Sequence, residues 1–263
     1  MSSGDPGERD LAAEWSLEGR VALVTGAGRG IGRACALELA ALGARVLLVA
    51  RTQSELDDAE AEIAYNGGRS ATFAADLTRE EEATAAVAAA QRLGEATICV
   101  NAAGTNRPGA ARDYPLADWD LLFAVNVRAT FLVCRAFGDR LLATAMPGSI
   151  VNISSQMGSV GYPGRAAYCA SKHAVEGLTK ALAVEWAPQR IRVNAVAPTF
   201  VDTPLTRPMF EDAEFAAEVM ARIPSGRLAT PADVANAVRY LACDASASVT
   251  GLSLKVDGGW TAW

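Results

Sequence analysis

The chain has few of the residues that build metal centres and disulfide frameworks. Its 263 residues include one histidine, His173, and five cysteines, which lie far apart at Cys35, Cys99, Cys134, Cys169 and Cys243. A single histidine excludes a histidine-rich metal site and a serine–histidine hydrolase triad. Because no two cysteines form a C-x-x-C pair, neither a zinc site nor a disulfide framework is expected. We therefore predict a protein without a bound metal, in a reducing cytoplasm.

The sequence also lacks an excess of positive charge, a long apolar run and a secretory signal. Its 24 basic residues against 30 acidic residues give a formal net charge of -6, which argues against general nucleic-acid binding. No uninterrupted apolar stretch approaches the ~20 residues of a membrane-spanning helix. Residues 1–9 are polar and include acids, unlike a signal peptide. We expect neither nucleic acid nor a membrane as a partner.

Short apolar runs alternate with alanine-rich stretches of helical period along most of the chain. The runs are apolar on both faces, as in parallel strands covered on both sides. They are residues 21–25, 45–50, 71–75, 97–101, 149–154, 191–196 and 252–256. Candidate helix caps are Thr78 with Glu81, and Thr230 with Asp233. This alternation predicts a single-domain, doubly wound α/β fold over residues 18–263, after a mobile lead-in over residues 1–17.

One region breaks the alternation. Residues 197–204 follow a predicted strand and lead into a short helical pattern that continues to Pro224. Long insertions at strand ends often act as lids over a binding site. We expect a lid over about residues 199–224, with a plain surface excursion as the alternative.

The first predicted strand runs into a glycine-rich turn. Thr25, Gly26, Gly30 and Gly32 form the pattern T-G-x-x-x-G-x-G, and a helical pattern begins at Arg33. Glycines let the chain turn sharply and let a diphosphate approach the N–H groups at a helix N-terminus. Because this turn lies between a first strand and a helix, the sequence favours a dinucleotide site over a purely structural turn.

The end of the second predicted strand indicates which dinucleotide binds. NAD-binding proteins usually carry an acid there, whereas this chain carries Arg51. A carboxylate would repel a 2′-phosphate, and an arginine pairs with it. Arg51, helped by Arg29, predicts that NADP(H) is preferred, without excluding NAD(H). A solvated surface arginine is the alternative.

Tyr168 and Lys172 are four residues apart, so on a helix they share a face. A neighbouring cation favours the phenolate and lowers the pKa of a tyrosine from its usual ~10. Tyr168 is then expected to exchange protons near neutral pH, as a general acid/base must. The pattern by itself also fits an ordinary helix surface, so its meaning depends on the other motifs.

Together the motifs resemble the short-chain dehydrogenase/reductase family, in its shorter single-domain branch, over about residues 18–263. The further matches are Asp76-Leu77, Asn101-Ala102-Ala103-Gly104, Asn126, Ser155 thirteen residues before Tyr168, Pro198-Thr199, and Thr203. Ser154 is the alternative to Ser155. Two positions depart from the family: Ala102 replaces an asparagine that helps to tie strands together, and Thr199 replaces a glycine beside the nicotinamide.

The resemblance implies a Rossmann fold with a seven-stranded, mostly parallel sheet and helices on both faces. It implies hydride transfer between a nicotinamide and a carbonyl or secondary alcohol carbon. Tyr168 would be the general acid/base. Lys172, with the positive charge of an oxidised nicotinamide, would lower the pKa of Tyr168 and would hold the ribose hydroxyls. Ser155 would donate to the substrate oxygen, and Asn126 would hold a water of a proton path. The implied cofactor-binding residues are Gly26, Arg29, Gly30, Ile31, Arg51, Asp76, Leu77, Asn101, Ala103, Gly104, Tyr168, Lys172, Pro198, Val201 and Thr203.

The substrate pocket is expected between the loops that follow the fourth, fifth and sixth strands. Its predicted residues are Ser155, Gln156, Met157, Tyr162, Tyr168 and Phe200, with Thr105 and the stretch from Leu205 to Met220 as further candidates. Core packing is the alternative for Met157 and Phe200. The mixture of polar and apolar groups suits a polyol, sugar or small keto compound, and Gln156 and Asn106 lean towards a polyol, sugar or sugar acid. A 3-oxoacyl thioester reductase and a non-catalytic dinucleotide sensor are the alternatives. Enoyl reductase fits less well, because that branch spaces its tyrosine and lysine further apart.

The family commonly assembles as homotetramers through the helices that carry Asn126 and Tyr168 and through the C-terminal strand. Two tryptophans, Trp260 and Trp263, lie at the end of this chain, where exposure to water would be costly. We therefore expect a homotetramer, with an interface or core contact for this segment.

Overall fold

The computed structural model describes residues 11–262 of the chain. The strands are β1 (Val21–Thr25), β2 (Arg45–Ala50), β3 (Arg69–Ala74), β4 (Ala96–Asn101), β5 (Gly148–Ile153), β6 (Ile191–Pro198) and β7 (Ser253–Val256). The α-helices are α1 (Leu11–Trp15), α2 (Gly30–Ala41), α3 (Gln53–Tyr65), α4 (Glu80–Leu93), α5 (Leu116–Phe123), α6 (Ala129–Thr144), α7 (Ala166–Trp186), α8 (Ala213–Ala221) and α9 (Pro231–Ala242). Each predicted strand is confirmed, with ends shifted by at most two residues.

The strands form one sheet in the order β3-β2-β1-β4-β5-β6-β7. Every neighbouring pair is parallel. From the central strand β1, the chain adds β2 and then β3 on one side. It then crosses back to β4 on the other side of β1 and adds β5, β6 and β7 in turn. The carboxyl ends of β1 and β4 lie side by side where the order reverses, which is where open α/β sheets bind their ligands.

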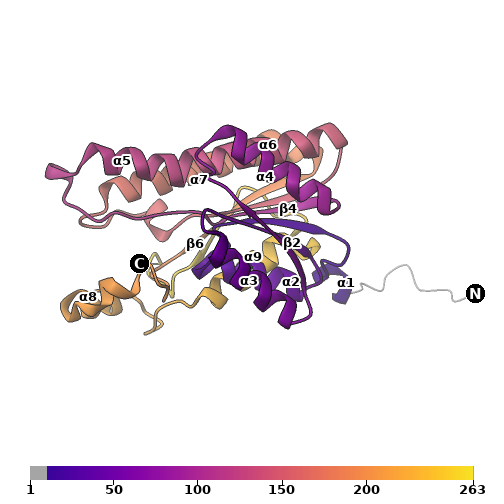
Figure 1. Cartoon of the computed structure of the whole chain (residues 1–263). Coiled ribbons are helices and arrows are strands. Elements are labelled where there is room, and N and C mark those ends of the chain that lie inside the picture. Colours follow the sequence, from indigo (N-terminus) through magenta and orange to yellow (C-terminus); the bar gives the residue numbers. More distant parts are fainter. Residues whose placement is uncertain (1–10, 263) are drawn as a thin grey trace, which may run out of the picture.

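Helices cover both faces of the sheet. In Figure 1, α4, α5, α6 and α7 lie on one side, and α2, α3 and α9 lie on the other. Strand β1 shows why its apolar run is unbroken: Ala22 and Val24 belong to the core beneath α2 and α9, while Val21 and Leu23 belong to the core beneath α4 and α6. Burial of each such aliphatic side chain contributes about 1.5–3 kcal/mol. The doubly wound α/β fold is thus confirmed.

The start of the described chain is part of the domain. Helix α1 precedes Leu17, which is fully buried, and the Trp15 ring lies 6.1 Å from the Tyr240 ring between centroids. The predicted lead-in over residues 1–17 therefore needs correction for residues 11–17, because they include helix α1, the Trp15 contact with α9 and the buried Leu17. Residues 1–10 lie outside the described residues.

The longest apolar helix of the described chain is a core helix. Residues 116–144 form a continuous helix of α5, a π-helical turn η2 (Ala124–Arg128) and α6. By length and composition alone this helix could cross a membrane, although Arg128 interrupts its apolar sequence, and 50% of its most apolar window is buried. Phe137 and Leu141 pack in the core against the sheet. This burial explains the apolar residues on the face of the helix that packs on the sheet.

The chain between β6 and α9 forms a separate excursion at the edge of the molecule. It contains a short 3-10 helix, η5 (Arg207–Glu211), and α8, which Figure 1 shows apart from the two helical layers. Its two ends are joined, because Val201 pairs with Ala229 in a β-bridge and the Asp202 N–H donates to the Ala229 carbonyl at 3.0 Å. The two ends of the segment predicted as a lid are therefore held together at Val201, Asp202 and Ala229, and we call this junction the base of the lid.

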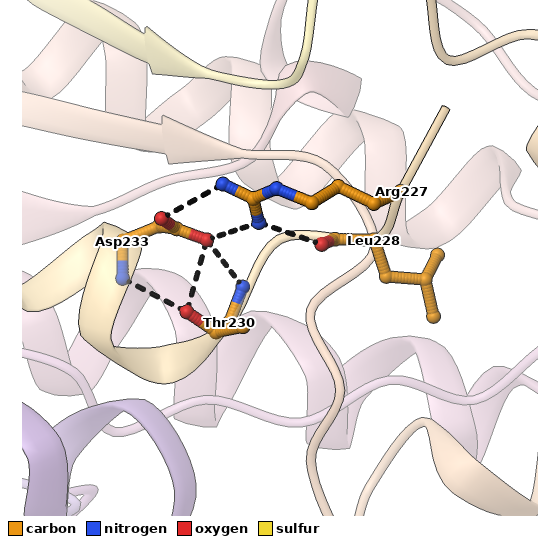
Figure 2. A network of polar contacts seen from close by, with 4 residues as sticks. All are labelled: Arg227, Leu228, Thr230 and Asp233. Atoms are coloured by element: carbon orange, nitrogen blue, oxygen red, sulfur yellow. Dashed lines mark hydrogen bonds and ion pairs between the residues drawn. The ribbon is translucent and has the colours of Figure 1, made fainter. Parts of the chain in front are cut away.

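The base is fixed by a polar network at the start of α9 (Figure 2). The Thr230 hydroxyl accepts a hydrogen bond from the Asp233 N–H at 3.2 Å, and the Asp233 carboxylate accepts one from the Thr230 N–H at 2.8 Å. The guanidinium of Arg227 donates to both Asp233 oxygens, at 2.7 and 3.1 Å, and to the Leu228 carbonyl. These bonds hold the pKa of Asp233 well below its usual value. The predicted cap at Thr230 is confirmed.

Candidate active site

A cavity of about 370 Å³ runs along the carboxyl ends of β1, β2, β3 and β4. Its walls come from the glycine turn, the ends of β2 and β3, the loop after β4, and the base of the lid. Ten predicted cofactor residues line it: Gly26, Arg29, Gly30, Ile31, Arg51, Asp76, Leu77, Ala103, Gly104 and Thr203. The topology thus brings together residues that are more than 170 positions apart in the sequence.

Two glycines of the turn, Gly26 and Gly32, have no room for a side chain. Gly26 has φ +65°, and a Cβ there would lie 2.8 Å from the Ala103 nitrogen. A Cβ on Gly32 would lie 2.2 Å from the Gly26 carbonyl oxygen. Gly30 also has a positive φ, +57°. The turn therefore presents bare backbone beside the N-terminus of α2, whose first N–H groups have no intrahelical partner. This arrangement fits the diphosphate of a dinucleotide.

Thr25 joins the glycine turn to the loop after β4. Its hydroxyl oxygen accepts hydrogen bonds from the N–H groups of Ala102 and Ala103, at 3.0 and 3.1 Å. This link holds the loop although Ala102 lacks the amide side chain found in the family. Asn101 does not line the cavity: it is buried, and its amide donates to the Asn152 side chain at 2.9 Å. Its side chain therefore ties β4 to β5, and a contact with the cofactor through its backbone stays a prediction.

Charges at the far end of the cavity surround the place of the adenosine ribose. Arg51 is exposed and lines the cavity, while Arg29 pairs loosely with Glu55 at 3.8 Å. Asp76 accepts two hydrogen bonds from Thr78, one from the hydroxyl at 2.8 Å and one from the N–H at 3.1 Å. These bonds, and more weakly the charge of Arg51, lower the Asp76 pKa. The predicted helix cap at Thr78 is wrong, because its hydroxyl is used by Asp76 and α4 begins after Arg79.

Tyr168 and Lys172 lie on one face of α7. The Lys172 ammonium is 5.7 Å from the centroid of the Tyr168 ring, and it donates to the Ile153 carbonyl at 2.9 Å. The Ser155 hydroxyl is the hydrogen-bonding neighbour of the Tyr168 phenol. Ser154 is instead packed beneath Gly158, where a Cβ would lie 2.9 Å from its hydroxyl oxygen. The geometry therefore assigns the serine role to Ser155.

Burial dominates the proton affinities of this pair. It raises the pKa of Tyr168 to about 12, although hydrogen bonding to Ser155 acts in the opposite direction. It lowers the pKa of Lys172 to about 8, against the opposing charge of Glu176. The groups of the chain alone therefore do not depress the Tyr168 pKa, because removing the phenolate from water outweighs the stabilisation from neighbouring groups. The predicted depression with the added charge of an oxidised nicotinamide stays a prediction. At neutral pH Tyr168 is a proton donor.

Asn126 occupies the π-helical turn η2, where an extra residue widens the helix; such turns are frequent at functional sites. Its amide donates to the Thr105 carbonyl at 3.0 Å and to the Ser171 hydroxyl at 3.1 Å, and its amide oxygen accepts from the Thr105 N–H at 2.8 Å. A Cβ on Gly104 would lie 3.4 Å from this oxygen and 3.8 Å from the Lys172 nitrogen. Asn126 thus connects the loop after β4 to the helix that carries the tyrosine.

The remaining cofactor candidates lie after β6. Thr203 lines the cavity and its hydroxyl is 3.1 Å from that of Thr206. Pro198 pairs with Val256 in the sheet, and Val201 is buried at the base of the lid. Neither these two residues nor Tyr168 and Lys172 belong to the cavity walls.

The predicted substrate residues lie around the tyrosine on the side of the lid. Met157 and Phe200 are buried in an apolar cluster with Trp260, and Tyr162 packs on Phe200 with ring centroids 6.0 Å apart. The core alternative therefore holds for Met157 and Phe200. Gln156 is 1% exposed, and neither of its side-chain polar atoms has a hydrogen-bond partner in the described chain.

Several cavity residues were missed by the sequence analysis. They flank motifs that were recognised, and they include Thr52 and Glu55 after β2, Thr78 after β3, Arg107 after β4, Val125 beside Asn126, and Pro204 in the lid. Their nearness in sequence to the motifs was the available signal. Trp260 is buried in the apolar cluster with Met157 and Phe200, as expected for a core contact. Trp263 lies outside the described residues.

Comparison with known proteins agrees with this site. A family model described as enoyl-(acyl carrier protein) reductase matches residues 26–261. A galactitol 2-dehydrogenase (L-tagatose-forming) of Cereibacter sphaeroides is 41% identical over 97% of this chain and 100% of its own length. A D-threitol dehydrogenase of Mycolicibacterium smegmatis is 40% identical over 97% of each chain.

The solved structures match as well. A Beutenbergia cavernae protein, described as an NAD(P)-dependent gluconate 5-dehydrogenase and holding NADP at low occupancy, has a TM-score of 0.90. It is 44% identical, and the match covers 95% of this chain and all of that one. Similarity of this extent, with the tyrosine, lysine, serine and asparagine in one site, settles the family. The chain belongs to the short-chain dehydrogenase/reductase family and is an oxidoreductase that interconverts an alcohol and a ketone with a nicotinamide dinucleotide.

Proposed function

We propose that the protein interconverts a secondary alcohol and a ketone on a small polyhydroxylated compound, with NADP(H) as the preferred cofactor. The observation that carries the substrate class is a set of buried polar atoms without hydrogen-bond partners in the described chain. They belong to Asn106 after β4, Gln156 after β5 and Thr199 after β6. Buried polar groups are normally paired, and an unpaired one costs about 1–3 kcal/mol. Hydroxyl groups of a bound substrate would satisfy them.

The protein's own groups account for the proton side of the reaction. The nicotinamide supplies hydride chemistry when it is bound. Tyr168 gives its phenolic proton to the oxygen of a ketone, or receives the proton of an alcohol, and Ser155 donates a hydrogen bond to the same oxygen. Lys172 lies on the same face of α7 and holds a positive charge beside the phenol. Asn126 fixes the loop that carries Gly104 against this helix.

The preference for NADP(H) is supported by the charges at the ribose end. Arg51 has no ion-pair partner among residues 11–262, so its guanidinium is free to pair with a 2′-phosphate. Replacing Arg51 by alanine should weaken NADPH binding about 10- to 100-fold, the range for a lost charge-assisted hydrogen bond, and leave NADH binding nearly unchanged. Calorimetric titration of both cofactors measures this. Equal losses for both would show that Arg51 does not read the phosphate.

Turnover tests the proposed reaction. NADPH oxidation should be followed with ketoses, keto acids, cyclic ketones and 3-oxoacyl thioesters, for the wild type and Tyr168→Phe. The variant should lose at least about 100-fold in turnover, because it lacks the proton donor, yet bind NADPH like the wild type. Normal turnover in Tyr168→Phe would refute the assignment. Turnover confined to 3-oxoacyl thioesters would favour the rival reductase reading, and tight NADPH binding without any turnover would favour a sensor.

We further propose a homotetramer. Large apolar side chains are exposed on the helices of one layer: Leu116 and Trp119 on α5, Phe131 on α6 and Val184 on α7. Contact between copies of this layer would remove them from water. Light scattering of the purified protein should give four times the 27.4 kDa of one chain. A monomer would refute the proposal.

A further inference from the structure

Arg165 is a buried cation that neither the cofactor cavity nor the proton chemistry uses. It is the residue immediately before α7 and lies three positions before Tyr168. The whole residue is only 6% exposed, which is rare for an arginine. It is not among the residues that line the dinucleotide cavity, so a cofactor phosphate does not explain it.

Its guanidinium lacks an anionic partner. The Nε group makes no hydrogen bond in the described chain, and one terminal nitrogen donates to the Met209 sulfur at 3.5 Å. A thioether is a weak acceptor. No carboxylate among residues 11–262 forms an ion pair with Arg165, whereas ten other arginines of this part of the chain have one. Burial of an unpaired guanidinium is costly, and it lowers the pKa of Arg165.

The surroundings of Arg165 are those of the expected substrate. Its charge acts on both Tyr162 and Tyr168. Met209 belongs to η5 of the lid, and the Gly109 N–H donates to the Gly164 carbonyl at 3.0 Å, which brings the loop after β4 to the same place. The free donors of Arg165 therefore lie where α7, the β4 loop and the lid meet, close to the general acid.

A second arginine in the same aromatic cluster provides the contrast. The Arg222 guanidinium lies over the rings of Tyr162 and Trp260, at 5.5 and 5.8 Å from their centroids, and pairs with Glu218 at 3.1 Å. Its charge is balanced by groups of the protein. Only the charge of Arg165 is left without a counterion in this cluster.

We propose that Arg165 binds the carboxylate of the substrate, so that the preferred substrate is a polyhydroxy acid rather than a neutral polyol. The inference rests on the proposed function and narrows its substrate class. A guanidinium fork pairs with both oxygens of a carboxylate. Such a contact would pair the buried charge and fix one end of the substrate relative to Tyr168.

Matched pairs of acid and alcohol test the proposal. D-Gluconate and D-glucitol differ only in a carboxylate against a hydroxymethyl group at one end, as do xylonate and xylitol, and threonate and threitol. For each compound kcat/KM is measured with NADP⁺ in the wild type, Arg165→Met, Arg165→Lys and Arg222→Met. Methionine keeps an unbranched apolar side chain beside Met209, and melting temperature and NADPH affinity report whether each variant folds.

The measured quantity is the ratio of kcat/KM for the acid to that for its alcohol. The wild type should favour the acid for at least one chain length, and Arg165→Met should reduce this ratio about 10- to 100-fold. Arg165→Lys should keep part of the preference, and Arg222→Met should leave the ratio unchanged. An equal loss for acid and alcohol in Arg165→Met, or a wild type that prefers the alcohol at every length, would overturn the proposal.

A binding measurement separates this proposal from the proposed reaction. The same six compounds are titrated by calorimetry into protein saturated with NADPH, so that turnover is not needed. Binding of the acids to the wild type that is lost in Arg165→Met supports the carboxylate site even if no compound reacts. Absence of acid binding to the wild type, or binding that Arg165→Met does not weaken, overturns it.

Discussion

Lys172 should make the stability of this protein depend on pH in a way that a methionine at the same position does not. Its side chain is held at a buried position, with the residue 5% exposed and the ammonium hydrogen-bonded to the Ile153 carbonyl at 2.9 Å. Burial lowers its pKa from 10.5 to about 8. Between these two values the unfolded chain binds a proton that the folded chain has lost.

The sign and size follow from linkage. Stability rises with pH wherever the unfolded state binds more protons, so the free energy of unfolding should rise from about pH 8 to about pH 10.5. Because one pKa unit corresponds to about 1.36 kcal/mol, the full change is about 3 kcal/mol. At pH 7, where Lys172 is charged, its burial therefore lowers the free energy of unfolding by about 3 kcal/mol. The protein tolerates this loss of stability because the charge lies beside Tyr168 in the active site.

The assay is urea unfolding of the wild type and Lys172→Met at several pH values between 7 and 10.5, without cofactor. The methionine variant leaves the Ile153 carbonyl without its donor, which costs about 1–3 kcal/mol at every pH. This constant shifts the difference in stability equally at every pH, so it does not affect the change of that difference with pH. Other groups that titrate alike in both proteins do not affect it either. The stability of the wild type minus that of the variant should increase by about 3 kcal/mol over this range. A difference that stays constant with pH would refute the buried, titrating lysine.

The remaining predictions concern the turn and the lid base. Gly32→Ala should abolish cofactor binding or folding, because its Cβ would lie 2.2 Å from the Gly26 carbonyl oxygen, and fluorescence titration with NADPH would detect this. Gly177→Ala is the matched control: nothing lies within 4 Å of its Cβ, so alanine in the middle of α7 should stabilise the fold by about 0.5–1 kcal/mol in urea unfolding. Destabilisation there would show a close contact at this surface. Asp233→Asn should cost about 1 kcal/mol at pH 7, since it weakens the α9 cap with Thr230. Because the Asp233 pKa is depressed, this cost should fade as the pH falls below about 4, where the wild-type carboxylate begins to lose its stabilising effect; a cost unchanged down to pH 2 would contradict the role of the carboxylate.

The dinucleotide turn and the tyrosine helix could be predicted from the sequence for local reasons. Glycines at Gly26 and Gly32 are required by contacts within the turn and by its neighbour at Ala103. Tyr168 and Lys172 share a helix face whatever the helix packs against. The strands were recognisable because a parallel sheet covered on both faces leaves long apolar runs.

Other features depended on packing that the sequence does not display. The pKa of Tyr168 is raised because burial outweighs the nearby cation, and the degree of burial is a property of the whole site. Asn101 matched a cofactor motif, yet its amide is used by Asn152 on the next strand. Thr78 matched a helix cap, yet its hydroxyl is bound by Asp76. Burial, a partner on a neighbouring strand and a competing local hydrogen bond thus decided what the motif patterns could not.

The sequence by itself determined the fold class, the positions of the motifs along the chain and the chemical groups of the reaction. Hydrophobic periodicity, the conformational freedom of glycine and the four-residue spacing on a helix are all local properties of the chain, so they can be recognised without the tertiary structure. Only the tertiary structure decided which serine meets Tyr168 and which arginine is buried without a counterion among the described residues. Arg33 and Arg165 are the same residue type, and the sequence does not show which of them is paired. In the structure the Glu62 carboxylate lies 2.6 Å from the Arg33 guanidinium, whereas the Arg165 guanidinium is buried beside the Met209 sulfur. Whether a charge is paired depends on residues far away in the chain, and folding alone brings them together.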